Sequence, residues 1–247
     1  MPRLAAGQSH PGPARPMKGK APKRSVPAKI VFLFDVDNTL LDNDRVMADL
    51  RHYLEKEIGI EGMQCYWDIF EQLRDELGYA DYLGALQRYR SENPHDLRLF
   101  AVSRFLIDYP FATRLFPHAL DVVERVKQWG PAVILSDGDV VFQPRKVERS
   151  GLFEAVNGNV LIYAHKEREL DEVAQRFPAD HYVMVDDKLR ILAAIKNTWG
   201  KRVTTVFVRQ GHYAHDSKTL AAYPPADVAF KQIGDLLNAN PPEWFTV

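Results

Sequence analysis

The sequence contains only one cysteine, Cys65, in 247 residues. A single cysteine excludes an internal disulfide and a metal site made of cysteines alone, so this thiol is either buried or reactive. Its neighbours Met63, Tyr66 and Trp67 favour burial. No run of about 18 apolar residues occurs, and the N-terminus lacks the apolar stretch of a secretory signal. We therefore expect no association with a membrane and a location in the cytoplasm.

The first 28 residues lack acidic side chains and contain six basic residues and six prolines. Such a segment cannot bury enough apolar surface to fold, so residues 1–28 are predicted to form a disordered basic leader. The remaining chain holds 26 basic and 33 acidic side chains, which argues against a body that binds nucleic acid. A solvated leader is favoured over one that touches acidic surfaces, and its prolines argue against an organellar transit peptide.

From Lys29 onward, short apolar runs alternate with segments of helical spacing. The runs cover residues 30–34, 132–135, 160–163, 182–185 and 203–208. Leu170, Val173 and Phe177 fall on one face of a helix predicted to begin near Lys166. This alternation predicts an α/β fold, with a Rossmann-like parallel sheet flanked by helices on both faces.

Polar side chains stand where three of these strands end. Asp35 and Asp37 follow the first strand, Ser136 the second, and Asp186 with Asp187 a later one. Ligands of open parallel sheets bind beyond the carboxyl ends of the strands, so these residues are expected to share one site. Neither common glycine-rich nucleotide-binding loop occurs in the sequence.

Four segments, in order, resemble the motifs of the haloacid dehalogenase superfamily over about residues 29–210. They are Asp35-Val36-Asp37-Asn38-Thr39-Leu40, Ser136 after its strand, Lys166, and the pair Asp186-Asp187. One departure is Glu167, which stands where many relatives have a proline after the lysine. The resemblance implies a magnesium-dependent hydrolysis of a small phosphomonoester through an aspartyl-phosphate intermediate.

The resemblance also implies a role for each acid. Asp35 is then the nucleophile and a magnesium ligand, and Asp37 is the general acid and base and offers its main-chain carbonyl to the metal. Asp186 and Asp187 complete the metal site. A divalent cation suits this chemistry because a phosphate monoester and a carboxylate nucleophile repel each other, and Mg²⁺ prefers oxygen ligands.

The remaining matched residues are expected to contact the substrate. Ser136 and Lys166 are implied to stabilise the transferring phosphoryl group, with Thr39, Asp137 and Gly138 as further substrate-binding residues. Simpler interpretations exist, namely a helix cap for Ser136, a solvated first-turn lysine for Lys166 and helix N-terminal acids for the pair Asp186-Asp187. Four matches in the expected order favour the functional interpretation.

Asp37 separates reaction types within this superfamily. The dehalogenases that gave it its name lack an acid at this second position and need no metal, because halide leaves without protonation. Asp37 therefore favours phosphoryl transfer over a 2-haloacid dehalogenase. A phosphotransferase or phosphomutase and a catalytically silent phosphoester-binding module remain as alternatives.

Residues 43–115 form an insertion between the first two motifs, with helical spacing throughout. They are predicted to fold into four or five helices as an all-helical cap domain, while residues 29–42 and 116–247 form the core. In the resembling family a type 1 cap of this kind covers the site and selects the substrate. We expect a small phosphorylated metabolite as the partner, no nucleic acid and no membrane, and a monomer or homodimer. Tyrosines and arginines between Tyr79 and Arg90, and the segment 209–215, are further candidates for substrate contact.

Overall fold

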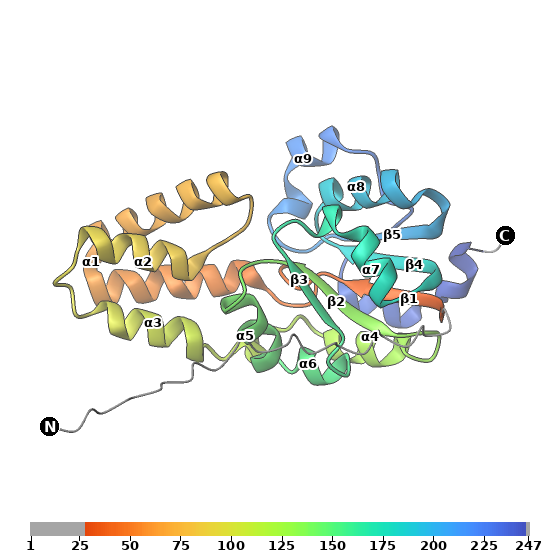
Figure 1. Ribbon diagram of the computed structural model, residues 1–247, viewed down its shortest axis with the longest axis horizontal. Helices are drawn as coiled ribbons and strands as arrows, with labels where there is room; N and C mark the ends of the chain where they lie inside the picture. Colours follow the sequence, from red (N-terminus) through yellow and green to blue (C-terminus); the bar gives the residue numbers. More distant parts are fainter. Residues whose placement is uncertain (1–27, 246–247) are drawn as a thin grey trace, which may run out of the picture.

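A computed structural model of the chain describes residues 28–245, so the predicted leader lies outside the described residues except for Ala28. Ala28 opens the first strand, one residue before the predicted boundary. Six strands pair in parallel in the order β3-β2-β1-β4-β5-β6 (Figure 1). Their bounds are β1 Ala28–Phe34, β2 Ala132–Asp137, β3 Val160–Tyr163, β4 Ala179–Asp186, β5 Val203–Val208 and β6 Val228–Phe230. The predicted Rossmann-like sheet is confirmed.

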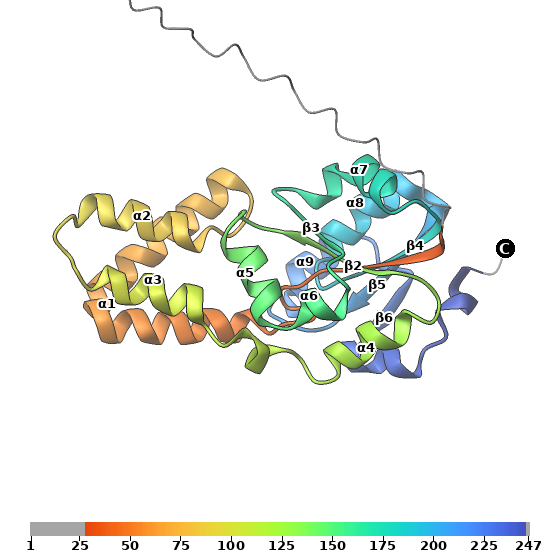
Figure 2. The ribbon, with the colours of Figure 1, turned by 60° about the horizontal axis from the view of Figure 1, so that its bottom comes forward.

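The central strand β1 is buried on both faces, which explains its continuous apolar sequence. Phe32 and Phe34 face one hydrophobic cluster and Val31 and Leu33 the other, because successive side chains of a strand point to opposite sides. On the Phe32 side lie α4 (Ala119–Val126), α5 (Phe142–Arg149), α6 (Leu152–Ala155) and the 3₁₀ segment η5 (Ile233–Asn238). On the Val31 side lie α7 (Leu170–Arg176), α8 (Leu189–Trp199) and α9 (Ser217–Ala222) (Figure 2).

The inserted segment forms a separate layer of helices beside the sheet (Figure 1). It contains α1 (Asn43–Leu77), α2 (Tyr82–Glu92), α3 (Leu99–Asp108) and the 3₁₀ turn η1 (Phe111–Arg114). The helix α1 breaks at Gly59, where φ is 83° and ψ is 169°, and its second half runs back toward the sheet. Gly59 tolerates this backbone because it lacks a Cβ atom. The segment thus supplies four α-helical stretches.

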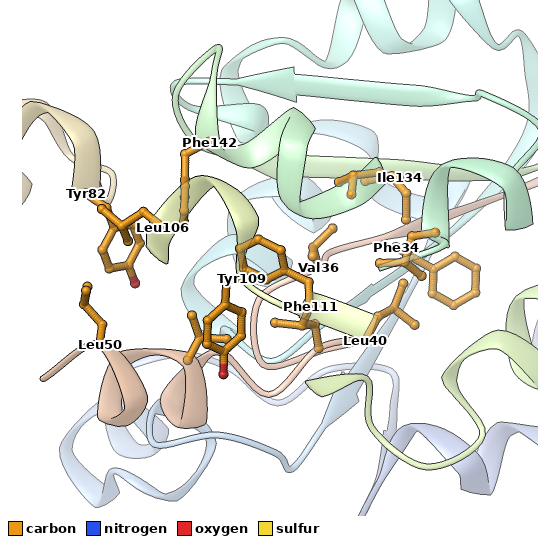
Figure 3. Packing of buried hydrophobic residues seen from close by; sticks show 14 of the residues in the cluster. Phe34, Val36, Leu40, Leu50, Tyr82, Leu106, Tyr109, Phe111, Ile134 and Phe142 are labelled. Atoms are coloured by element: carbon orange, nitrogen blue, oxygen red, sulfur yellow. The ribbon is translucent and has the colours of Figure 1, made fainter. Parts of the chain in front are cut away.

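Two neighbouring chain segments connect the helical layer to the sheet. Leu41 forms an antiparallel bridge with Leu115, and the amide of Phe116 donates to the carbonyl of Leu40 over 2.9 Å. Apolar side chains of both parts meet at this junction and belong to a single hydrophobic cluster (Figure 3). Phe111 and Phe142, for example, lie with ring centroids 5.7 Å apart. The inserted helices and the sheet are therefore packed together through a shared core.

Two local expectations differ from the structure. The strand β6 was not predicted, since its three residues Val228–Phe230 are only half-buried or exposed and give no clear apolar pattern. The helix expected to begin near Lys166 begins instead at Leu170, after a short 3₁₀ turn at Lys166–Arg168. The amide of Lys166 donates to the Asp137 carboxylate over 2.8 Å, which holds this turn against the end of β2. Among residues 28–245, no helix is long and apolar enough to cross a membrane.

The burial of residues 30–34 in β1 leads to a testable expectation for stability. Phe32 is 0% exposed, so Phe32→Ala should lower the free energy of unfolding by about 3–5 kcal/mol in urea titrations, through lost burial and the cavity left behind. Phe100→Ala is the control, because Phe100 is 74% exposed and should change stability by no more than about 0.5 kcal/mol. Equal effects of the two substitutions would contradict this account of the core.

Candidate active site

The acids predicted from the strand ends meet at the point where the strand order of the sheet reverses. Asp35 follows β1, and Asp186 and Asp187 stand at the end of the adjacent β4. The amide of Asp35 donates to the carbonyl of Val185 over 3.0 Å, which fixes the two strand ends against each other. Open α/β sheets bind ligands at such a switch point. Local sequence and sheet topology together bring these acids into one place.

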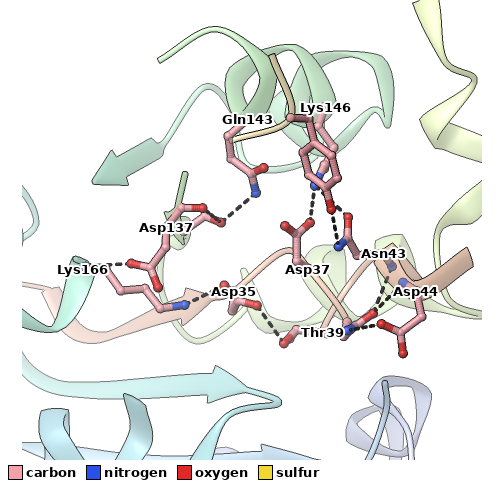
Figure 4. Close-up of polar contacts among 12 residues, drawn as sticks. Asp35, Asp37, Thr39, Asn43, Asp44, Asp137, Gln143, Lys146 and Lys166 are labelled. Atoms are coloured by element: carbon pink, nitrogen blue, oxygen red, sulfur yellow. Dashed lines mark hydrogen bonds and ion pairs between the residues drawn. The ribbon is translucent and has the colours of Figure 1, made fainter. Parts of the chain in front are cut away.

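Lys166 is the cation that contacts this group, and its ammonium group points at Asp35 (Figure 4). Its side chain is buried, and its Nζ atom lies 2.6 Å from Oδ1 of Asp35 and 2.7 Å from Oδ2 of Asp186. Burial alone would lower the pKa of Lys166, but Asp186 and Asp35 raise it above its ordinary value. Lys166 is therefore a permanent positive charge beside the candidate nucleophile.

Three of the carboxylates are arranged as a metal site requires. One oxygen each of Asp35, Asp186 and Asp187 lies within 4.8 Å of the others, and all three side chains are buried. Both carboxylate oxygens of Asp187 are buried without a hydrogen-bond partner in the described part of the chain. Unpaired buried carboxylate oxygens are costly, and a hard cation with oxygen ligands is the group that satisfies them. The donor set fits magnesium.

The charge balance of the cluster points the same way. Four carboxylates and two ammonium groups interact in this cluster, which leaves a formal surplus of two negative charges when all are ionised; they are Asp35, Asp137, Asp186, Asp187, Lys166 and Lys188. Burial raises the pKa of Asp186 to about 6 and that of Asp187 well above its ordinary value. A divalent cation is the charge that balances this surplus.

The other predicted residues surround the nucleophile. Thr39 donates its hydroxyl to Oδ2 of Asp35 over 3.2 Å. Ser136 is buried at the end of β2, where its hydroxyl accepts a 2.9 Å hydrogen bond from Nε2 of Gln143. The amide of Gly138 is used within the sheet, since it donates to the carbonyl of Tyr163 over 2.9 Å. What Gly138 supplies is space, because a Cβ atom there would lie 2.7 Å from Gln143.

Asp37 does not join the metal-type group, and its carboxylate pairs with a residue that the sequence analysis missed. Nζ of Lys146 lies 2.6 Å from Oδ1 of Asp37 and 3.0 Å from Oδ1 of Asn43 (Figure 4). Lys146 is 0% exposed. A signal was present in the sequence, because Lys146 stands four residues after Phe142 and just before Val147, on the apolar face of α5.

A cavity of about 370 Å³ opens between the helical layer and the sheet beside these acids. Its lining from the sheet side includes Asp37, Asp137 and Lys188, and that from the helical layer includes Tyr79 and Tyr82. Of the segment 209–215, His212 and Tyr213 line it too. Arg88, Tyr89 and Arg90 do not, and Arg88 instead pairs with Glu76 at 3.1 Å. The helices therefore supply one wall of the cavity, and Asp37 and Asp137 lie on the other.

The sequence of residues 31–197 matches the family described as haloacid dehalogenase-like hydrolase. This chain belongs to that family. No curated protein matches the sequence. A solved haloacid dehalogenase-like hydrolase from Burkholderia xenovorans LB400 is 63% identical, with a TM-score of 0.84, over 87% of this chain and 100% of the other.

More distant solved structures share the fold of this hydrolase. The hydrolase YfnB of Bacillus subtilis, solved with magnesium bound, is 17% identical with a TM-score of 0.58, over 85% of this chain and 98% of the other. An L-2-haloacid dehalogenase of Xanthobacter autotrophicus with covalently bound chloropropionic acid is 18% identical with a TM-score of 0.55, over 85% and 97% of the two chains. The fold is thus common to relatives with different ligands.

The metal fit of this hydrolase can be tested without any substrate. Mg²⁺ at about 100 times its Kd should stabilise the folded protein by about 2.7 kcal/mol and raise Tm by about 5–10 °C in thermal unfolding. Asp187→Asn should abolish this response, and without metal the variant should be at least as stable as the wild type, because one unpaired buried charge is removed.

Asp180→Asn is the matched control, since Asp180 is an exposed aspartate at the start of β4. This variant should keep the full magnesium response. A wild type that Mg²⁺ does not stabilise, or an Asp187→Asn variant that responds as the wild type does, would show that the three carboxylates do not hold the cation.

Proposed function

We propose that this hydrolase cleaves a small phosphomonoester, a phosphorylated metabolite of the cytoplasm, in a magnesium-dependent reaction through an aspartyl-phosphate on Asp35. The observation that carries the proposal is that Asp35 and Asp37, two residues apart in the sequence, are held in different ways. Asp35 lies in the buried group with Asp186 and Asp187, whereas Asp37 lies outside that group and lines the cavity. One acid is placed to attack and the other to move protons.

Asp35 is oriented for attack by its two hydrogen-bond partners. Lys166 binds Oδ1 and Thr39 binds Oδ2, so the carboxylate cannot rotate freely. Asp35, Asp186 and Asp187 would hold magnesium together with the main-chain carbonyl of Asp37. The bound cation supplies charge neutralisation for the phosphoryl group and the attacking carboxylate.

In the first step an oxygen of Asp35 forms a bond to phosphorus while the bond from phosphorus to the leaving oxygen breaks. Asp37 donates a proton to that leaving oxygen. In the second step Asp37, now a carboxylate, takes a proton from water, whose oxygen attacks phosphorus and releases Asp35 and inorganic phosphate. Ser136 and Lys166 would stabilise the charge on the phosphoryl oxygens in both steps, because they stand at the ends of β2 and β3, on the same side of Asp35, with Nζ of Lys166 2.6 Å from Asp35.

The cavity supports a leaving group larger than a few atoms. Its volume of about 370 Å³ exceeds what a phosphoryl group needs, and aromatic rings line it on both sides, among them Phe70, Tyr79, Tyr82 and Tyr213. Such rings bind the apolar faces of sugars or planar groups. A nucleotide or a sugar phosphate is accordingly the favoured substrate class.

The test is release of inorganic phosphate from a panel of phosphomonoesters with Mg²⁺ and with a chelator. Wild-type turnover should require the metal, and Asp35→Asn should lower kcat by at least about 10⁴-fold, because it removes the nucleophile and keeps the shape. Asp180→Asn again serves as the control and should be fully active.

The same panel includes 2-haloacids and a second acceptor alcohol. Halide release in the presence of chelator would replace the proposal with a dehalogenase, and phosphoryl transfer to the alcohol in preference to water would replace it with a phosphotransferase. Tight binding of esters without any product would indicate a silent binding module.

A further inference from the structure

The ion pair between buried Lys146 and partly exposed Asp37 has no role in the reaction steps described above. Lys146 reaches from α5 across the cavity wall to Asp37, over 109 residues of sequence, and its ammonium group has no exposed surface. Besides Asp37 and Asn43 it faces the rings of Phe142 at 5.3 Å and Tyr82 at 6.0 Å. The ammonium group is thus enclosed by two oxygen acceptors and two aromatic faces.

A buried lysine is a poor device for stability alone. Removing an ammonium group from water costs more than a single ion pair usually returns, and an apolar side chain of similar volume often stabilises a fold as well or better. The Asp37 side chain is 21% exposed and lines the cavity, so it does not need a buried partner for its own solvation. The pair is therefore better explained by what it does to the Asp37 carboxylate.

We propose that Lys146 is a positioning residue that holds Asp37 by one oxygen and so directs the other toward the leaving group. Lys146 binds Oδ1, and Oδ2 makes no hydrogen bond to any residue between 28 and 245. With Oδ1 held, the carboxylate loses its rotation about the Cβ–Cγ bond, and Oδ2 is the oxygen that carries the proton to the substrate. This role rests on the proposed function, in which Asp37 is the acid and base.

The two catalytic carboxylates would then each have a lysine of their own. Lys166 holds Asp35 and Asp186, and Lys146 holds Asp37, with no residue shared between the two ion pairs. Separate anchors allow the nucleophile and the acid to be oriented independently. This division accounts for two buried lysines in one site, where a single one would serve the nucleophile.

The same network connects Asp37 with the helical layer. Asn43, the first residue of α1, accepts from Lys146 with its carbonyl oxygen and donates with its amide to the hydroxyl of Tyr82 in α2 over 3.2 Å. Tyr82 also lines the cavity. The anchor of the acid is therefore completed only when the helices are seated on the sheet, which couples proton transfer to a covered site.

The experiment compares esters whose leaving groups differ in their need for a proton. Lys146→Met, nearly equal in volume and uncharged, should lower kcat/KM for the best alkyl phosphomonoester of the panel by about 10²-fold, the lower end of what general acid catalysis contributes. For p-nitrophenyl phosphate kcat/KM should fall by less than about fivefold, because nitrophenolate leaves unprotonated. A misfolded or loosened site would lower both values equally.

A double-mutant cycle with Asp37→Asn shows whether Lys146 acts through Asp37. In the Asp37→Asn background, Lys146→Met should cause no further loss with the alkyl ester, and the double variant should be more stable to heat than Asp37→Asn alone, because the lone buried ammonium is gone. Additive losses in kcat/KM would overturn the proposal.

Matched variants complete the design. Lys196→Met removes another paired lysine, bound to Asp227 at 2.8 Å on the far part of the sheet, and should leave the ratio of the two kcat/KM values unchanged. Asn43→Leu keeps Lys146 but removes its second oxygen acceptor. This variant should lower kcat/KM for the alkyl ester by less than Lys146→Met does, again with little effect on p-nitrophenyl phosphate. It keeps the proposal testable if Lys146→Met does not fold.

Different outcomes overturn the proposed function and the role of Lys146. Wild-type protein that hydrolyses no ester with Mg²⁺ would overturn the proposed function, and the role of Lys146 with it. Wild-type turnover combined with equal losses on both esters in Lys146→Met and Asn43→Leu would overturn the role of Lys146 and leave the proposed function standing.

Discussion

Three buried carboxylates have oxygens within 4.8 Å of one another where the strand order of the sheet reverses. Lys166 reduces their mutual repulsion through its ion pairs with two of them, Asp35 and Asp186. This lysine follows β3, whereas the acids follow β1 and β4, so its two ion pairs tie three strand ends together. The donor atoms and the surplus negative charge of the cluster fit a divalent cation. The charge balance between Lys166 and the three carboxylates thus depends directly on how the strands are arranged in the sheet.

The buried acids of this hydrolase and the residues of the opposite cavity wall stand on different parts of the fold. Asp35, Asp186 and Asp187 stand at the ends of buried strands, where backbone hydrogen bonds and burial of their side chains keep them in place. The opposite wall of the cavity comes from the inserted helices, with Tyr79 and Tyr82 among its residues. In the proposed reaction, changes in the helices would therefore alter which leaving group fits, while the sheet keeps the same chemistry.

The local sequence predicted most of the strands and the polar residues at their ends. The apolar run ending in Asp35 predicted a buried strand with an acid at its end, and the same reasoning located Ser136 and Asp186. These predictions succeed because the pattern of a buried parallel strand depends on the strand's own residues. The local sequence did not predict the short edge strand β6, because this strand buries too little surface to give an apolar pattern. It also did not predict the late start of α7, because that start depends on the contact between Lys166 and Asp137.

The sequence by itself determined the order of the strands along the chain, the residue types at their ends and the helical nature of the insertion. Only the tertiary structure decided which of these residues meet. Lys146 becomes a partner of Asp37 because α5 packs against α2, where the rings of Phe142 and Tyr82 lie 5.0 Å apart. Both oxygens of Asp187 are buried without a hydrogen-bond partner among residues 28–245. Burial and charge pairing of this kind arise from contacts between residues more than 100 positions apart, which no local pattern records.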